Sequence, residues 1–420
     1  MAIRRSWKGD TSLKNALSNN RGIQILRSFR YRNYRLLWGT NVITLSGYWI
    51  LLTAQGWLVL QLTDSAFWVG LIAFIMGIPA LFLSPFGGVY ADRFDRRKLM
   101  LAGQGLSGIL ILALAALTST GIIAIWHIVV ISVLLAIVWA FTDPAYSAVI
   151  PSLVPPEDLM NAVAINSISG RASRSIGPAI AGALMALVAV GGALYGAGIA
   201  FLIGLPLVFS MRLPPMVIGK RASTGATLRE GLRYIRNNTI TLTVLLIVAS
   251  VSLFALPYLS LMPVFARDVL GAGEAGYSLL MTVTGVGGLL GALAAAILGD
   301  FKRKGRLLIV TALTFTLTLI PFSVSKSFHA ALVLAIIMGC ANGLFYTVAA
   351  VLLLSSVSDQ FRGRVMGLNA VTWYLPSVGS LVVGAASDWI GLPVTLVFGA
   401  LICVGLILGV ALRRPALRRL

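Results

Sequence analysis

The chain carries little charge and few of the side chains that enzymes use. Charged residues make up 11% of its 420 residues, against about 25% in an average soluble domain. It has two histidines and two cysteines, and Cys340 and Cys403 have no metal-type spacing. None of its thirteen acidic residues falls near the centre of an apolar run. We therefore expect no metal site, no cofactor and no enzymatic activity, and we expect both cysteines to be small buried residues without a disulfide.

Apolar residues dominate instead, at 58% of the chain. A bilayer core of about 30 Å requires about 20 apolar residues per helix. Twelve runs have that length, which predicts an all-α membrane protein with twelve transmembrane helices and little chain left for a soluble domain. The runs are 36–62, 66–90, 98–118, 122–143, 159–190, 193–211, 240–265, 275–299, 306–325, 328–355, 364–388 and 391–412.

The cations lie in every second gap between these runs. Lysine and arginine number 33 against 13 acids, for a net charge of +20. All of them except Arg267 and Lys326 fall in segments that share one side when the N-terminus is cytoplasmic. Cytoplasmic loops retain Lys and Arg, so the pattern predicts both termini inside. The excess charge is then expected to face anionic lipid, and no nucleic-acid partner is expected.

The longest polar interruption divides the runs six and six. We expect a basic tail at 1–35, a first half at 36–211, a linker at 212–239, a second half at 240–412 and a basic tail at 413–420. The halves also resemble each other, since 64–100 parallels 273–308 and 153–166 parallels 356–369. Duplicated halves around a site at the membrane midplane are how many transporters achieve alternating access.

The loop after the second run reads GGVYADRFDRRKLM. Its pattern resembles the loop signature of the major facilitator superfamily, although Asp95 stands where the general pattern has glycine. The ADRFDRR form is similar to the enterobactin-exporter-like branch, which exports drugs and siderophores, and NYRLLW, AQGWLVLQLT and SRSIGPAIAGAL agree with that branch. The resemblance implies a monomeric secondary transporter of two pseudo-symmetric six-helix halves in the cytoplasmic membrane of a bacterium. The matching residues are Gly88, Asp92, Arg93, Arg96 and Arg97.

This loop is predicted to act as an inner gate. A short turn places Asp92 near a helix end and the three arginines at the inner interface, where they can pair with acids of neighbouring helix ends. Asp143 is the expected partner. Such a cluster would hold the inner faces of the halves together when the cavity opens outward. The alternative is that these charges only determine topology.

The fifth run carries Gly177, Pro178 and Gly182. This spacing resembles the signature of exporters in the family, which favours export over import. The alternative is close helix packing with no directional meaning, because glycine lets helices approach each other and proline kinks them.

A central cavity is predicted from polar side chains at helical spacing. Arg171 and Arg174 are three residues apart and share a face, where they would contact an anion or pair with Asp143 or Glu157. A polar face on a membrane helix belongs against protein or a water-filled cavity, so interhelical hydrogen bonding is the alternative for the set. The other candidate cavity residues are Asn41, Tyr48, Gln55, Asn342, Tyr346, Asn369 and Trp373.

Together these features predict secondary active export of a small amphipathic or anionic compound, such as a drug-like molecule or a siderophore. Proton coupling is implied by the resemblance, and Asp143 is the candidate carrier among the acids. The second hypothesis for the function is a lipid or lysolipid flippase. A non-transporting membrane receptor or scaffold is the third, although it would not require duplicated halves. The expected partners are the small-molecule substrate, protons and membrane lipid.

Overall fold

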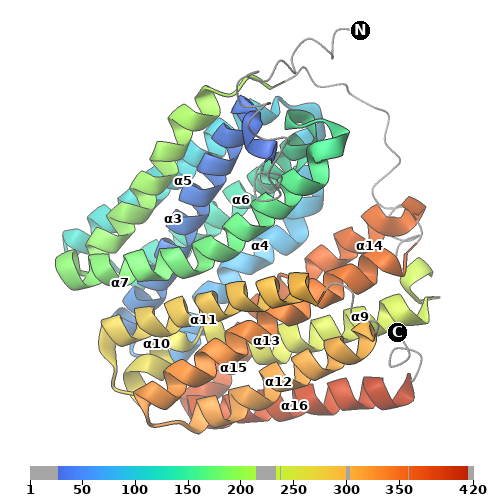
Figure 1. Ribbon diagram of the computed structural model, residues 1–420. Coiled ribbons are helices and arrows are strands. Elements are labelled where there is room, and N and C mark those ends of the chain that lie inside the picture. Colours follow the sequence, from blue (N-terminus) through green and yellow to red (C-terminus); the bar gives the residue numbers. More distant parts are fainter. Residues whose placement is uncertain (1–26, 214–232, 237, 299–302, 358, 415–420) are drawn as a thin grey trace, which may run out of the picture.

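The computed structural model describes residues 27–213, 233–236, 238–298, 303–357 and 359–414. These residues form helices and no strands (Figure 1). The elements are η2 (Arg27–Arg30), α3 (Arg32–Thr63), α4 (Ala66–Arg93), α5 (Arg96–Ser119), α6 (Ile125–Leu153), α7 (Pro156–Phe209), α9 (Thr239–Ser250), η3 (Val251–Ala255), η4 (Leu256–Leu259), α10 (Met262–Val264), η5 (Phe265–Val269), α11 (Gly273–Ile297), α12 (Lys304–Val324), α13 (Phe328–Ser355), α14 (Asp359–Val371), α15 (Leu375–Ile390) and α16 (Leu392–Arg413).

The described helices supply the predicted twelve crossings. Eleven segments are long and apolar enough to span a membrane. One of them, α7, has 54 residues, about 80 Å at 1.5 Å per residue and too long for a single crossing. Val188 and Ala189 leave the helical conformation, Ala189 with φ 57°, and the chain turns back so that Gly196 lies against Leu184. Figure 1 shows the first half above the second.

Two of the crossings in the second half are broken. The seventh runs through α9, a π-helical turn at η3, a 3-10 turn at η4, and α10. Pro257 and Pro263 lie in this stretch, and proline removes a backbone donor from the helix. The eleventh is interrupted between α14 and α15 by a turn at 372–374. The crossing predicted at 364–388 is present as Val365–Ile390, but the turn divides it into two helices, so its polar residues do not lie on one continuous helical face.

Helices of the first half extend past their apolar runs, and α3 and α6 do so most. Helix α3 begins at Arg32 rather than at 36. Helix α6 continues to Leu153, well past the predicted end at 143, although Pro144 and Pro151 lie within it. The extension matters because it moves Asp143 from the end of a helix to its interior.

The halves pack through two helix pairs, α7 with α11 and α4 with α15. Glycines allow both approaches. A Cβ atom on Gly384 would lie 2.6 Å from the carbonyl oxygen of Ala66, and one on Gly285 would lie 2.7 Å from that of Arg174. Helix pairs in lipid depend on such close backbone contact.

The segment before α3 is anchored to the start of α7. The Asp158 carboxylate is 1% exposed and accepts hydrogen bonds from Arg30 and, at 2.7 Å, from the Tyr31 hydroxyl. Arg27 lies 3.3 Å away on its other oxygen. Burial, followed by the hydrogen bond to Asp158, raises the pKa of Tyr31 to about 12. The segment 27–31 is therefore held by ion pairs and a hydrogen bond to the buried Asp158 carboxylate at the N-terminal end of α7.

Candidate functional site

A cavity of about 400 Å³ lies among the helices of the first half and extends to the start of α15. Small-molecule sites in proteins have about 300–1,000 Å³, so it has room for a small drug-sized compound. Residues of α3, α4, α5 and α6 form most of its wall, and Ser260, Trp373, Tyr374, Pro376 and Ser377 complete it from the second half.

Aromatic rings form much of the wall. Trp139 of α6 meets Tyr48 of α3 edge to face at 5.1 Å between ring centroids and stacks on Phe201 at 6.2 Å. The Trp139 indole also donates a 3.0 Å hydrogen bond to Ser107, which fixes its orientation. Across the cavity, Trp373 is 64% exposed and rests against Tyr346 at 5.5 Å. The two halves thus present aromatic surfaces to the same space.

Asp143 is the one charged residue among the described residues that line this cavity. It is exposed, and no hydrogen bond or ion pair joins it to another described side chain. Four and three residues away on α6, Trp139 and Tyr146 share its helical face. Gln104 donates to the Tyr146 hydroxyl at 2.6 Å and to Thr44 at 2.8 Å. The carboxylate therefore stands among oriented aromatic and amide groups without a cationic partner.

Two of the predicted cavity residues, Tyr48 and Trp373, lie in this wall. Arg171 instead crosses to the second half and donates to the Thr347 hydroxyl at 3.1 Å. Arg174 lies over the Trp49 ring at 5.1 Å. Neither arginine lines the cavity, and neither makes a described ion pair with Asp143 or Glu157.

Three of the remaining predicted cavity residues, Asn41, Gln55 and Tyr346, make side-chain hydrogen bonds within the protein. Asn41 donates to Asn166 at 2.8 Å, and Gln55 donates to Ser132 at 2.8 Å. The hydroxyls of Tyr346 and Ser252 lie 2.7 Å apart. Asn342 is 7% exposed and its amide nitrogen has no partner in the described structure, whereas Asn369 is half-buried. The contacts of Asn41, Gln55 and Tyr346 are of the kind expected for interhelical hydrogen bonding.

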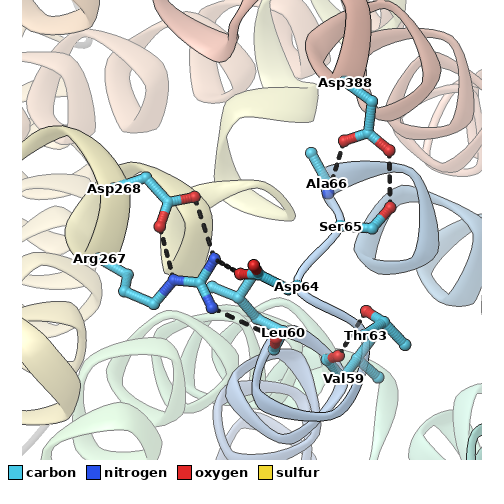
Figure 2. A network of polar contacts seen from close by, with 9 residues as sticks. All are labelled: Val59, Leu60, Thr63, Asp64, Ser65, Ala66, Arg267, Asp268 and Asp388. Atoms are coloured by element: carbon cyan, nitrogen blue, oxygen red, sulfur yellow. Dashed lines mark hydrogen bonds and ion pairs between the residues drawn. The ribbon is translucent and has the colours of Figure 1, made fainter.

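The end of the bundle predicted to face outward is held closed by polar contacts between the halves (Figure 2). Arg267, at the end of the seventh crossing, pairs with Asp64 of the first half and lies 2.5 Å from its own neighbour Asp268. The hydrogen bond with Asp268 is the main reason that the pKa of Arg267 is raised, so the guanidinium stays charged. Arg267 also contacts the carbonyl oxygen of Leu60 at 3.4 Å.

Asp388 of the second half caps a helix of the first half. Its carboxylate accepts hydrogen bonds from the Ser65 hydroxyl at 2.6 Å and from the backbone N–H groups of Ala66 and Phe67 at 2.9 and 3.3 Å. Ala66 is the first residue of α4, so the negative charge sits at the positive end of that helix. We call the Arg267–Asp64 pair and the Asp388 cap the outer gate.

A third contact supports the outer gate. Glu274, in the first turn of α11, accepts hydrogen bonds from Trp57 at 2.8 Å and Gln61 at 3.1 Å, both on α3. The Trp57 ring stacks on Tyr277 at 5.8 Å. The sequence offered one signal for this gate, because Arg267 is one of two cations on the side where cations are rare.

The predicted inner gate lies at the opposite end. The Asp92 side chain is outside the described residues, and Arg93 is exposed. Arg96 donates to the carbonyl oxygen of Ala148 at 2.9 Å. Arg97 donates to the carbonyl oxygen of Phe209 and lies over its ring at 5.0 Å. Gly88 has open space around its Cα. Pairing of this loop with Asp143 stays a prediction about the outward-open state.

The glycine–proline pattern of α7 lies where helices cross. A Cβ atom on Gly177 would be 2.8 Å from the carbonyl oxygen of Ser46 on α3, and one on Gly182 would be 2.5 Å from Ser278 on α11. Pro178 is buried between them. These contacts account for the residues as packing sites, and their link to the direction of transport stays a prediction.

Comparison with known proteins identifies the family. The chain matches the family described as transmembrane secretion effector over residues 24–419. It is 30% identical to the uncharacterized MFS-type transporter YfiS of Bacillus subtilis over 83% of this chain and 85% of that one. It is 26% identical to the multidrug efflux pump Tap of Mycobacterium tuberculosis, covering 90% and 93%. It is 24% identical to the staphyloferrin A transporter of Staphylococcus aureus, covering 85% and 90%.

Solved structures agree on the fold. A D-xylose-proton symporter matches with a TM-score of 0.72 and 15% identity, covering 90% of this chain and 97% of that one. A bacterial homolog of the human lysosomal transporter Spinster, inward-facing and unoccupied, matches with a TM-score of 0.67 and 15% identity, covering 93% and 96%. The chain therefore belongs to the transmembrane secretion effector family of major facilitator transporters and is a multi-pass membrane protein.

Proposed function

We propose that this protein is a secondary active exporter of small amphipathic compounds and works as a monomer in the cytoplasmic membrane of a bacterium. The family supports secondary transport, and efflux pumps and a siderophore transporter are among the relatives. The observation that carries the proposal is a compound-sized cavity beneath a closed outer gate. With the outer gate closed, we expect this cavity to load from the cytoplasm, which is what an exporter requires.

In alternating access, one of the two gates would open as the other closes. When the outer gate opens, the arginine-rich loop after α4 would close the inner faces, as its sequence predicts. With the termini on the cytoplasmic side, the cations that determine topology face inward. Protons are the proposed coupling ion, and Asp143 is the proposed carrier because its carboxylate reaches the cavity.

Flux across proteoliposomes tests the function. Purified protein should move compounds from a panel of drug-like amines and siderophores, and an uncoupler that collapses an imposed pH gradient should abolish accumulation. Transport whose rate does not change with the pH gradient would contradict proton coupling but not the export function. Absence of flux for every compound, with labelled lysolipid moving between leaflets, would replace the exporter with a flippase.

A further inference from the structure

We infer that the cavity selects amphipathic cations and that Asp143 is the residue that binds the positive charge. The transport part of this inference rests on the proposed export function, whereas the binding part does not. It narrows the substrate to compounds with a protonated or quaternary amine attached to an aromatic or apolar body.

The first argument is the charge inside the cavity. An isolated carboxylate within the membrane costs roughly 2.5–3.5 kcal/mol on insertion scales, and such groups are kept for a function or a partner. Asp143 lies within α6, exposed to the cavity, with no described partner. A cationic ligand would supply the missing charge, whereas an anionic ligand would meet repulsion.

The second argument is the position of the nearby arginines. An anion-binding cavity would direct Arg171 or Arg174 into its space. Here Arg171 donates to Thr347, and the Arg174 guanidinium lies over the Trp49 ring. Neither contributes to the cavity wall. The sequence-based expectation was an amphipathic or anionic substrate, and the anionic alternative lacks a lysine or arginine in the described cavity wall.

The third argument is the composition of the wall. Aromatic faces attract cations with about 0.5–2 kcal/mol each, and aromatic cages recognise quaternary ammonium groups. Tyr48, Trp139 and Tyr146 come from the first half and Trp373 from the second. Trp139 is fixed by Ser107, and Tyr146 by Gln104. The Asp143 carboxylate would neutralise the charge of a hydrophobic cation, and the oriented aromatic rings around it would contact the apolar body of that cation.

A pair of probes with the same shape and opposite charge tests this inference. Tetraphenylphosphonium and tetraphenylborate each carry four phenyl rings around one central atom. Each would be titrated into the purified full-length protein in nanodiscs, with quenching of tryptophan fluorescence as the readout, since Trp139 and Trp373 line the cavity. We expect tetraphenylphosphonium to bind at least tenfold more tightly than tetraphenylborate. Asp143→Asn, which keeps the side-chain shape, should remove that preference.

The matched control is Glu157→Gln, which neutralises an exposed acid in the first turn of α7 and should leave both affinities unchanged. Equal affinities for the two probes, or an unchanged preference in Asp143→Asn with intact thermal stability, would overturn the inference. If tetraphenylborate binds more tightly and is pumped, the export function stands and the cationic class fails. If tetraphenylphosphonium binds through Asp143 but never crosses proteoliposomes, the site stands and the export function fails.

Discussion

Removing the Asp388 cap should open the outer gate. The carboxylate satisfies two backbone N–H groups at the start of α4 and the Ser65 hydroxyl. Loss of a helix N-cap costs about 0.5–2 kcal/mol, and here that stabilisation exists only while the two halves touch. Asp388→Ala should therefore shift the equilibrium toward the outward-open state by about 2- to 30-fold.

The Arg267–Asp64 pair should contribute less. The Asp64 side chain is 83% exposed and that of Arg267 is 30% exposed, and solvent-exposed ion pairs are worth about 0.2–1 kcal/mol. Arg267→Gln should therefore shift the same equilibrium by about 1.4- to 5-fold. The structure thus predicts an order of effects, with the cap outweighing the ion pair although the pair carries two full charges.

Spin labels can report the change. The free cysteines Cys340 and Cys403 would first be replaced, and labels placed at Thr120 and Lys326, which are exposed in outer loops of opposite halves. Distance distributions from double electron–electron resonance should gain a longer component in Asp388→Ala. Thr63→Val is the matched control, because the Thr63 hydroxyl bonds only within α3, to Val59. A distribution for Asp388→Ala that matches this control, or a larger effect for Arg267→Gln, would refute the reasoning.

Three further predictions concern stability and gating. Asp158→Asn should destabilise the protein by about 1.5–3 kcal/mol, because it weakens the charge-assisted hydrogen bonds from Arg30 and Tyr31, and thermal unfolding would show this against Glu157→Gln. Gly384→Val should cost about 1–3 kcal/mol through overpacking against α4, measured as folded yield, whereas Gly405→Ala, with open space around it, should be neutral. Asp92→Asn should lower transport and leave membrane insertion intact, and unchanged flux in proteoliposomes would leave that loop with a topological role only.

The sequence predicted the architecture well because the bilayer imposes a simple rule on length. Apolar runs of about 20 residues and the alternation of cations determine the number of crossings. The rule fails where a helix extends past its apolar run, as α6 does to Leu153. That error placed Asp143 at a helix end and hid its position in the cavity wall. The sequence also did not predict breaks such as the turn at 372–374, because an apolar run has the same composition whether or not its helix is interrupted.

The site was harder to predict than the fold. Spacing shows which polar residues share a helix face, but it does not show whether that face meets a cavity or another helix. Gln55 and Asn41 satisfied the spacing and are bonded to Ser132 and Asn166. Trp139, Tyr146 and Gln104 line the cavity and had no distinguishing signal among so many apolar neighbours. The outer gate depends on pairs more than 200 residues apart in sequence, which no local pattern reveals.

The interruption between α14 and α15 has a consequence for how the protein moves. Helix α15 packs along α4, whereas α14 lies beyond the turn at 372–374. If the eleventh crossing were one continuous helix, a change of tilt at one end would also move the other end. An interrupted crossing would let α14 change its tilt while α15 stays packed against α4, with Trp373 in the turn between them. Trp373 also lines the cavity. A ligand that contacts its indole would therefore touch the turn between α14 and α15 directly, so ligand binding and the relative movement of these two helices would be coupled through one residue.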